Sequence, residues 1–280
     1  LASRVVVTNQ IVVRSVNGPM VTQVVGQRTI NPRIRGVYLG DGSVWSGFTI
    51  SNGNTQIESG GVSASYDSGG GVFCETSECI VTNCLIIGNS GGEGGGIYGG
   101  TVRNSIITGN STYDNLGYGG GAANSSLNQC VVTNNTSRYG GGGVFVGSLN
   151  NCLVVSNSTS SGGGGAEYCS MNNCTVVGNT GGNGGGALFS SLTNCIAHFN
   201  RFGVNNPNDV SYNSPNPRGP ERYLYNSSIG RISGIPLASV GNFTNAPVFV
   251  NLAAGDFRLQ SNSPCVNDGT NSYVTSTTDL

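Results

Sequence analysis

The sequence predicts an all-β chain wound as a parallel β-helix with about 22 residues in each coil. A short motif repeats six times between residues 83 and 200, a glycine run separates consecutive copies, and the chain contains no Lys and 47 Gly. The second motif position recurs at spacings of 21, 25, 22, 22 and 21 residues, at Cys84, Ser105, Cys130, Cys152, Cys174 and Cys195. Because one such unit cannot bury its own apolar face, we expect the copies to stack.

Strand alternation assigns the two faces of each motif. Cys84 and Ile86 point into the helix, whereas Leu85 and Ile87 point outward. The equivalents of Ile86 are apolar in every copy: Ile107, Val132, Val154, Val176 and Ala197. The equivalents of Ile87 include Thr108, Thr133 and His198, which is typical of a partly solvated face. We therefore expect His198 to be a surface residue.

Asparagines flank each motif, and glycines follow it. Asparagine side chains stacked once per coil can hydrogen-bond along the column, and asparagine tolerates left-handed backbone at a corner. The glycine runs, such as Gly94–Gly96 and Gly119–Gly121, let the chain turn where a Cβ would clash. A phosphate-binding loop is not expected, because the required Lys and helix context are missing.

Composition narrows the functional classes. Charged residues make up 9% of the chain, the net charge is −1 and every basic residue is Arg. Without a basic stripe, nucleic acid is not an expected partner, and no apolar run is long enough for a membrane span. Five of the nine cysteines lie in the inward ladder and are predicted to be packed thiols. The sequence leaves open the disulfide state of Cys74, Cys79, Cys84, Cys169 and Cys265.

Taken in order, the chain is predicted to form one β-helix domain over 1–280. Residues 1–68 form irregular first coils with Trp45 in their core, 69–200 form the regular coils, and 201–280 form irregular last coils and a cap. The segment from Asp256 to Gly269 is expected to fold over the last coils. The chain opens Leu-Ala-Ser-Arg without a leader, so we expect it to be part of a longer protein with neighbouring domains.

The segments Arg4–Thr8, Val13–Pro19 and Ser46–Ile50, together with the repeated Asn-Cys units, resemble bacterial secreted right-handed parallel β-helix repeat proteins. The tail from Phe249 to Gly269 is similar to segments of pectate-lyase-like helices and of surface proteins with a choice-of-anchor domain. This resemblance implies a right-handed helix and an extracellular or cell-surface location in a polysaccharide-degrading bacterium. Lyases, hydrolases, adhesins and carbohydrate-binding modules share the scaffold, so the resemblance does not choose among them.

One pair of carboxylates is a candidate for catalysis. Glu93 and Asp114 each follow the second motif position by nine residues, which would place them one coil apart, as a glycosidase requires. The insertion that carries Asp114 leaves a second alignment open, in which Tyr118 lies over Glu93. A calcium or ligand contact and a plain solvated turn are the other interpretations of these acids.

Aromatic residues gather at the same corner. Tyr113 and Tyr118 lie in or beside the insertion, and Arg138 and Tyr139 follow one coil later. A second column follows the glycine runs and is expected to face outward because it carries a charge: Phe73, Tyr98, Ala123, Phe145, Glu167 and Leu188. Exposed rings beside polar groups suit sugars. Rings that merely cover the side of the helix are the alternative.

We therefore expect a non-catalytic module that binds an extended plant-type polysaccharide such as xylan and needs no cofactor, with calcium as an open alternative. The expected ligand contacts are Glu93, Tyr98, Tyr113, Asp114, Tyr118, Arg138, Tyr139 and Glu167. A lyase or glycoside hydrolase and a surface stalk or adhesin remain the alternatives.

Overall fold

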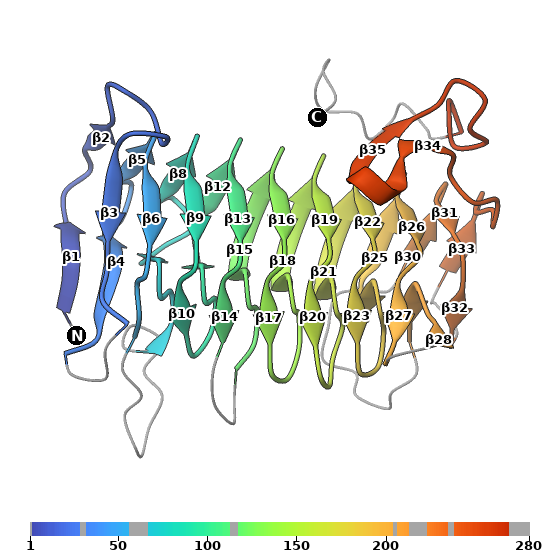
Figure 1. Ribbon diagram of the computed structural model, residues 1–280, viewed down its shortest axis with the longest axis horizontal. Coiled ribbons are helices and arrows are strands. Elements are labelled where there is room, and N and C mark those ends of the chain that lie inside the picture. Colours follow the sequence, from blue (N-terminus) through green and yellow to red (C-terminus); the bar gives the residue numbers. More distant parts are fainter. Residues whose placement is uncertain are drawn as a thin grey trace.

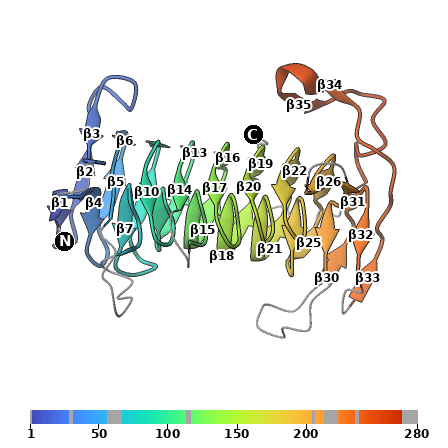
Figure 2. The same cartoon turned by 60° about the horizontal axis from the view of Figure 1, so that its bottom comes forward.

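The computed structural model describes residues 2–28, 32–55, 67–112, 117–203, 206–212, 223–234 and 238–268. Its strands stack side by side along one axis, as Figures 1 and 2 show. Equivalent residues of successive coils are parallel neighbours, for example Val132, Val154 and Val176. The predicted parallel β-helix with about 22 residues per coil is confirmed.

A nine-stranded parallel sheet contains the repeated motif, one strand per coil. Its strands are β3 (Gln23–Val25), β6 (Thr49–Ser51), β9 (Leu85–Ile87), β13 (Ile106–Thr108), β16 (Val131–Thr133), β19 (Leu153–Val155), β22 (Thr175–Val177), β26 (Ile196–His198) and β31 (Ser228–Ile229).

A seven-stranded sheet follows the first corner of each coil. Its strands are β10 (Ser90–Gly91), β14 (Ser111–Thr112), β17 (Thr136–Ser137), β20 (Ser158–Thr159), β23 (Thr180–Gly181), β27 (Arg201–Phe202) and β28 (Asn206–Pro207). The last pairing, between β27 and β28, is antiparallel and ends the regular stack on this side.

The large sheet has 17 strands in two adjoining columns. The first column contains β1 (Ala2–Val7), β4 (Ile34–Leu39), β7 (Val72–Cys74), β11 (Ile97–Tyr98), β24 (Ala187–Leu188), β29 (Val210–Ser211) and β32 (Ile232–Ser233). The second contains β2 (Val12–Arg14), β5 (Val44–Ser46), β8 (Ile80–Thr82), β12 (Thr101–Arg103), β25 (Ser191–Thr193), β30 (Tyr223–Tyr225) and β33 (Ala238–Val240). Three longer strands run through both columns: β15 (Ala122–Asn128), β18 (Val144–Asn150) and β21 (Ala166–Asn172).

The bore of the helix is lined by thiols and branched aliphatic side chains, as the alternation predicts. The inward positions from Ile86 to Ala197 are all fully buried, and so is Trp45. The described cysteines are free thiols, so the question of a disulfide at Cys74, Cys79 or Cys84 is answered in favour of thiols. In the ladder, each thiol donates to a backbone carbonyl, as Cys130 does to Asn128 at 3.3 Å.

A column of buried asparagine side chains runs along the bore beside the nine-stranded sheet. Each Nδ2 donates to the Oδ1 of the next coil at 2.9–3.0 Å, through Asn89, Asn110, Asn135, Asn157, Asn179 and Asn200. The column ends on Asp209, whose Oδ1 accepts from Asn200 Nδ2 at 2.9 Å. The predicted asparagine ladder is confirmed, with a carboxylate as its last rung.

The glycine runs make room for this column. A Cβ on Gly121 would lie 2.9 Å from the Nδ2 of Asn135 and 2.7 Å from the carbonyl oxygen of Gly143. The first glycine of the run has a different requirement, because Gly119 has a φ of +65°, which favours glycine. The repeated Gly-Gly-Gly therefore combines a turn residue with a residue that must lack a side chain.

An arm of the chain lies against the nine-stranded sheet near the C-terminal end of the stack (Figures 1 and 2). It contains β34 (Phe249–Asn251), the short 3-10 helix η1 (Leu252–Ala254) and β35 (Asp256–Leu259), which pairs antiparallel with β34. β35 lies across a cleft from the nine-stranded sheet, and the segment expected to cover the last coils ends at Gly269, outside the described residues. No helix among the described residues is long and apolar enough to cross a membrane.

Candidate functional site

The predicted aromatic column exists on the large sheet and faces away from the bore. In-register pairs join Tyr38 to Phe73, Phe73 to Tyr98, and onward through Ala123, Phe145, Glu167 and Leu188. Their chain neighbours Val72, Ile97 and Val144 are fully buried in the bore. Alternation therefore directs the column outward, as expected.

The N-terminal part of this column is a stack of three rings. The centroids of Tyr38 and Phe73 lie 5.6 Å apart, and those of Phe73 and Tyr98 lie 5.5 Å apart with planes at 2°. Rings stacked on one another present mainly their edges and hydroxyl groups to solvent. This segment can therefore offer a ligand the polar edges of Tyr38 and Tyr98 rather than open ring faces.

The C-terminal part of the column has tilted rings. Ala123 interrupts the column, and the Tyr118 ring lies 4.5 Å from Phe145 and 6.1 Å from Tyr139, at 30° and 39° to them. Phe145 meets Tyr168 nearly edge-on, at 80°. Tilted rings leave more of their faces accessible, so this part suits contact with the C–H face of a ligand.

Glu93 joins the two groups of rings. Its backbone pairs in register with Tyr118, which in turn pairs with Gly140, so the second of the two alignments considered for Glu93 is confirmed. Burial raises the pKa of the Glu93 carboxyl. The pKa of Tyr98 is raised mainly by burial and further by the Glu93 charge, and the pKa of Tyr118 is raised by burial and by the charges of Glu167 and Glu93.

Glu167 faces out of the bore but is only 7% exposed. Its Oε2 accepts hydrogen bonds from the backbone N–H groups of Gly141 (3.2 Å) and Gly163 (3.0 Å). Burial outweighs these bonds and raises the pKa of Glu167 to about 7. The carboxyl group thus holds two glycine turns together and is less accessible to a ligand than its outward position indicated.

Arg138 and Tyr139 lie at the edge of the same surface. Arg138 is exposed, and its guanidinium carbon lies 5.9 Å from the centroid of the Tyr139 ring. Tyr113 and Asp114 lie outside the described residues, so the structure gives no geometry for a Glu93–Asp114 pair. We call the surface formed by Glu93, Tyr98, Tyr118, Tyr139 and Phe145 the aromatic face.

Sequence reasoning missed a row of strained residues next to the aromatic face. Val146, Tyr168 and Phe189 each follow a column residue, and their φ angles are +51°, +54° and +48°. This left-handed conformation is unfavourable for aromatic and above all for β-branched residues. The same position is held by Gly99 and Asn124 in earlier coils, which adopt it readily. These residues could have been found from the sequence, because each one directly follows a residue of the aromatic column, at the position where earlier coils have Gly99 and Asn124.

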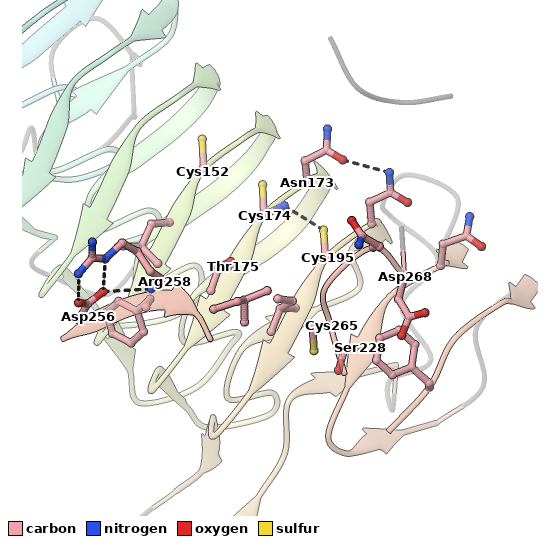
Figure 3. A pocket seen from close by; sticks show the side chains of 18 of the residues that line it. Cys152, Asn173, Cys174, Thr175, Cys195, Ser228, Asp256, Arg258, Cys265 and Asp268 are labelled. Carbon is pink, nitrogen blue, oxygen red and sulfur yellow. Dashed lines mark hydrogen bonds and ion pairs between the residues drawn. The ribbon is translucent and has the colours of Figure 1, made fainter. Parts of the chain in front are cut away.

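A large cleft of about 1080 Å³ lies between the arm and the nine-stranded sheet. Figure 3 shows Thr175, Asp256 and Arg258 among its lining side chains. Arg258 pairs with Asp256 at 2.6 Å, and this hydrogen bond lowers the pKa of Asp256 to about 2. The repeats could not predict this cleft, because it depends on where the non-repeating arm lies.

The arrangement of His, Cys, Asp and Glu side chains can be compared with what a metal site requires. Among the described residues, no group of three or more His, Cys, Asp or Glu side chains is arranged to hold a metal ion. The Glu93 carboxyl is accompanied by phenolic hydroxyls, which favour hydrogen bonds to a polar organic ligand.

Comparison with known proteins identifies the fold. No family model matches the sequence, and no curated protein sequence matches it. The structure is similar to the crystal structure of pectate lyase Pel9A, with a TM-score of 0.53 and 14% sequence identity over 89% of this chain and 72% of that chain. The chain thus has a pectate-lyase-like parallel β-helix fold.

Proposed function

We propose that this chain binds an extended polysaccharide, without cleaving it, on the aromatic face. The observation that supports this most directly is the tilted group of Tyr118, Tyr139 and Phe145 beside Glu93, whose backbone pairs in register with Tyr118. Tilted rings can contact the apolar face of a sugar, while the carboxyl and phenolic groups accept and donate hydrogen bonds to its hydroxyls. A surface that continues over several coils matches a linear chain better than a single small molecule.

The polysaccharide we favour is a neutral plant-type chain such as xylan. Xylan is rich in hydroxyl groups and presents C–H faces, which are the two features that the aromatic face complements. Secretion and attachment to neighbouring domains belong to the same proposal, since a module of this kind acts where its polymer is.

Binding is tested by affinity electrophoresis and calorimetry against a panel that includes xylan. We expect Tyr118→Ala and Tyr139→Ala each to weaken binding about tenfold or more, because aromatic side chains dominate contact energies. Tyr225→Ala is a matched control, since Tyr225 lies in β30 at the other column of the large sheet. Unchanged affinity in both tyrosine variants would place the site elsewhere.

The enzyme alternative is tested in the same samples. Release of reducing ends or of unsaturated products from any polysaccharide in the panel, abolished by Glu93→Gln, would contradict a purely binding role. Absence of retardation for every polymer in the panel would instead favour a stalk or adhesin.

A further inference from the structure

The first coil, residues 2–28, is the outermost described coil on the N-terminal side of the stack (Figure 1). Its strands are β1, β2 and β3. Among the described residues, β1 pairs only with β4, β2 only with β5 and β3 only with β6. The outer edge of each strand therefore presents backbone N–H and C=O groups with no described strand beside them. Such an edge can pair with a strand from another chain.

The bore is only partly covered at the first coil. Val5, Val13 and Val24 pack against the core but are only partly buried. Their in-register partners in the next coil are at most 2% exposed: Val37, Trp45 and Ile50. Apolar side chains from a strand added outside β1 would lie over these valines and remove them from water, which is favourable.

Exposed apolar side chains are concentrated on the same coil. Seven of the seventeen exposed large apolar side chains among the described residues lie here: Val6, Ile11, Val12, Val16, Met20, Val21 and Val25. Single exposed apolar residues are ordinary in a folded protein, whereas a group gathered on one end of the molecule marks an interaction surface.

The loop between β2 and β3 has a fixed shape, although it carries three of these exposed side chains (Figures 1 and 2). Ser15 Oγ donates to Thr22 Oγ1 at 2.7 Å and accepts from the Gly18 N–H at 3.0 Å. Thr49 Oγ1 donates to the Pro19 carbonyl at 2.6 Å. A loop that is already ordered loses little conformational entropy when a partner covers it.

The charge of the first coil is one-sided. Residues 1–40 contain five Arg and no Asp or Glu. Arg4 in β1, Arg14 in β2 and Arg28 after β3 are all exposed. Arg4 Nε donates to the Val25 carbonyl at 2.9 Å, so this side chain crosses the open end from β1 to β3. Exposed arginines without a carboxylate favour an acidic partner, and they oppose a second copy placed head-to-head, which would bring like charges together.

We propose that the first coil binds an extended, acidic segment of another protein, which adds to β1 and continues the large sheet by one strand. The backbone of this segment pairs with the outer edge of β1, and its inward apolar side chains cover Val5 and Val13. Its carboxylates lie beside Arg4 and Arg14. A lipid surface would also attract apolar and basic groups, but it cannot pair with the backbone of an edge strand, so the edge favours a polypeptide. The inference goes beyond polysaccharide binding, since this surface shares no residue with the aromatic face.

Calorimetry with three synthetic peptides tests the proposal. The probes are acetyl-Glu-Val-Glu-Val-Thr-Val-Glu-Val-amide, the same peptide with Lys in place of each Glu, and the acidic peptide with every backbone nitrogen methylated. We expect the acidic peptide to bind about tenfold or more tightly than either of the others, because one reverses the charge and the other has no backbone donor. Binding of the acidic peptide should slow amide hydrogen exchange in residues 2–7 and leave residues 144–150 unchanged.

The arginines are tested by Arg14→Gln/Arg28→Gln, which removes two exposed charges. We expect the preference for the acidic over the lysine peptide to fall about threefold or more in this variant. Arg103→Gln is the matched control, because Arg103 is exposed in the same column of the large sheet as Arg14, three coils further along. The control should bind the acidic peptide as the wild type does.

Several outcomes would each overturn the proposal: no binding of the acidic peptide at millimolar concentration, equal binding of the methylated peptide, no preference over the lysine peptide, or slowed exchange only outside the first coil. Protection of residues 2–7 by phosphatidylserine vesicles but not by the peptide would assign the surface to a membrane instead. Protection that appears with rising protein concentration, together with a dimer in sedimentation, would assign it to a second copy. Failure of xylan binding with intact binding of the acidic peptide would overturn the proposed function alone.

Discussion

The buried carboxyl group of Glu167 shows how neighbouring coils determine the exposure and the pKa of a single side chain. Glu167 stands in a column that otherwise contains rings and aliphatic side chains, and it is buried there with two backbone N–H groups as partners. Its charge predicted the outward direction of the column correctly. The sequence could not show that two glycine turns would cover the carboxyl group, because that depends on the distance between turns in neighbouring coils.

The raised pKa of Glu167 makes the stability of the protein depend on pH. The folded-state pKa of about 7 lies above the ordinary value of 4.5, so the folded chain holds this proton more tightly than the unfolded chain. The stabilisation from Glu167 is therefore fully present below about pH 4.5 and is lost as the pH rises through 7. We expect a loss on the order of 3 kcal/mol across this window.

Urea unfolding of wild type and Glu167→Gln across this window measures the effect. The glutamine keeps a neutral oxygen acceptor for Gly141 and Gly163, so the free energy of unfolding of wild type should fall relative to the variant as the pH rises. Glu78→Gln, at an exposed position, serves as the matched control. A difference between wild type and Glu167→Gln that stays constant with pH would show that the folded protein does not perturb this carboxyl group.

At the scale of elements, the asparagine column holds each strand of the nine-stranded sheet to the next coil. Asn157 accepts from the backbone N–H and the Nδ2 of Asn135, and its own Nδ2 donates to the Val132 carbonyl and to Asn179 Oδ1. An interior rung must therefore both donate and accept. Asp209 can end the column because the last rung only has to accept.

Asn157→Ala is expected to destabilise the protein by about 3 kcal/mol or more, because it leaves buried donors of Asn135 and a buried carbonyl without partners. Asn157→Asp should also destabilise at neutral pH and recover in part on acidification, when the carboxyl group regains a donor. Chemical unfolding monitored by circular dichroism measures both, with Asn128→Ala as a half-exposed control. Stabilities of the Asn157 variants equal to that of the control would show that the column contributes little.

At the scale of the whole molecule, the sequence predicts the features that recur in every coil, but it does not predict where the non-repeating segments lie. The spacing of Cys84, Cys130 and Cys152 predicts the stacking and the inward thiols, and the glycine runs with the charge of Glu167 predict the outward aromatic column. The cleft under the arm and the burial of His198, which is only 3% exposed, depend on where a non-repeating segment meets the last coils. The position of His198 in the motif predicted a surface residue, which the structure corrects.

The aromatic face is predicted by the repeat in part only. Its column was predictable from the repeat, whereas the tilt of Tyr118 against Tyr139 and Phe145 arises because Ala123 leaves a gap that a ring from the neighbouring turn reaches. Stacked rings and tilted rings in one column offer different chemistry, and only the structure distinguishes them. The proposed polysaccharide site is accordingly centred on the tilted group.

The most direct measurement is a crystal structure of the protein soaked with a neutral xylo-oligosaccharide. We expect an ordered oligosaccharide along the aromatic face, with a sugar ring against Tyr118 or Tyr139 and a hydroxyl group within hydrogen-bond distance of Glu93. An ordered oligosaccharide in the cleft beneath β35, with the aromatic face left bare, would contradict the placement of the polysaccharide site.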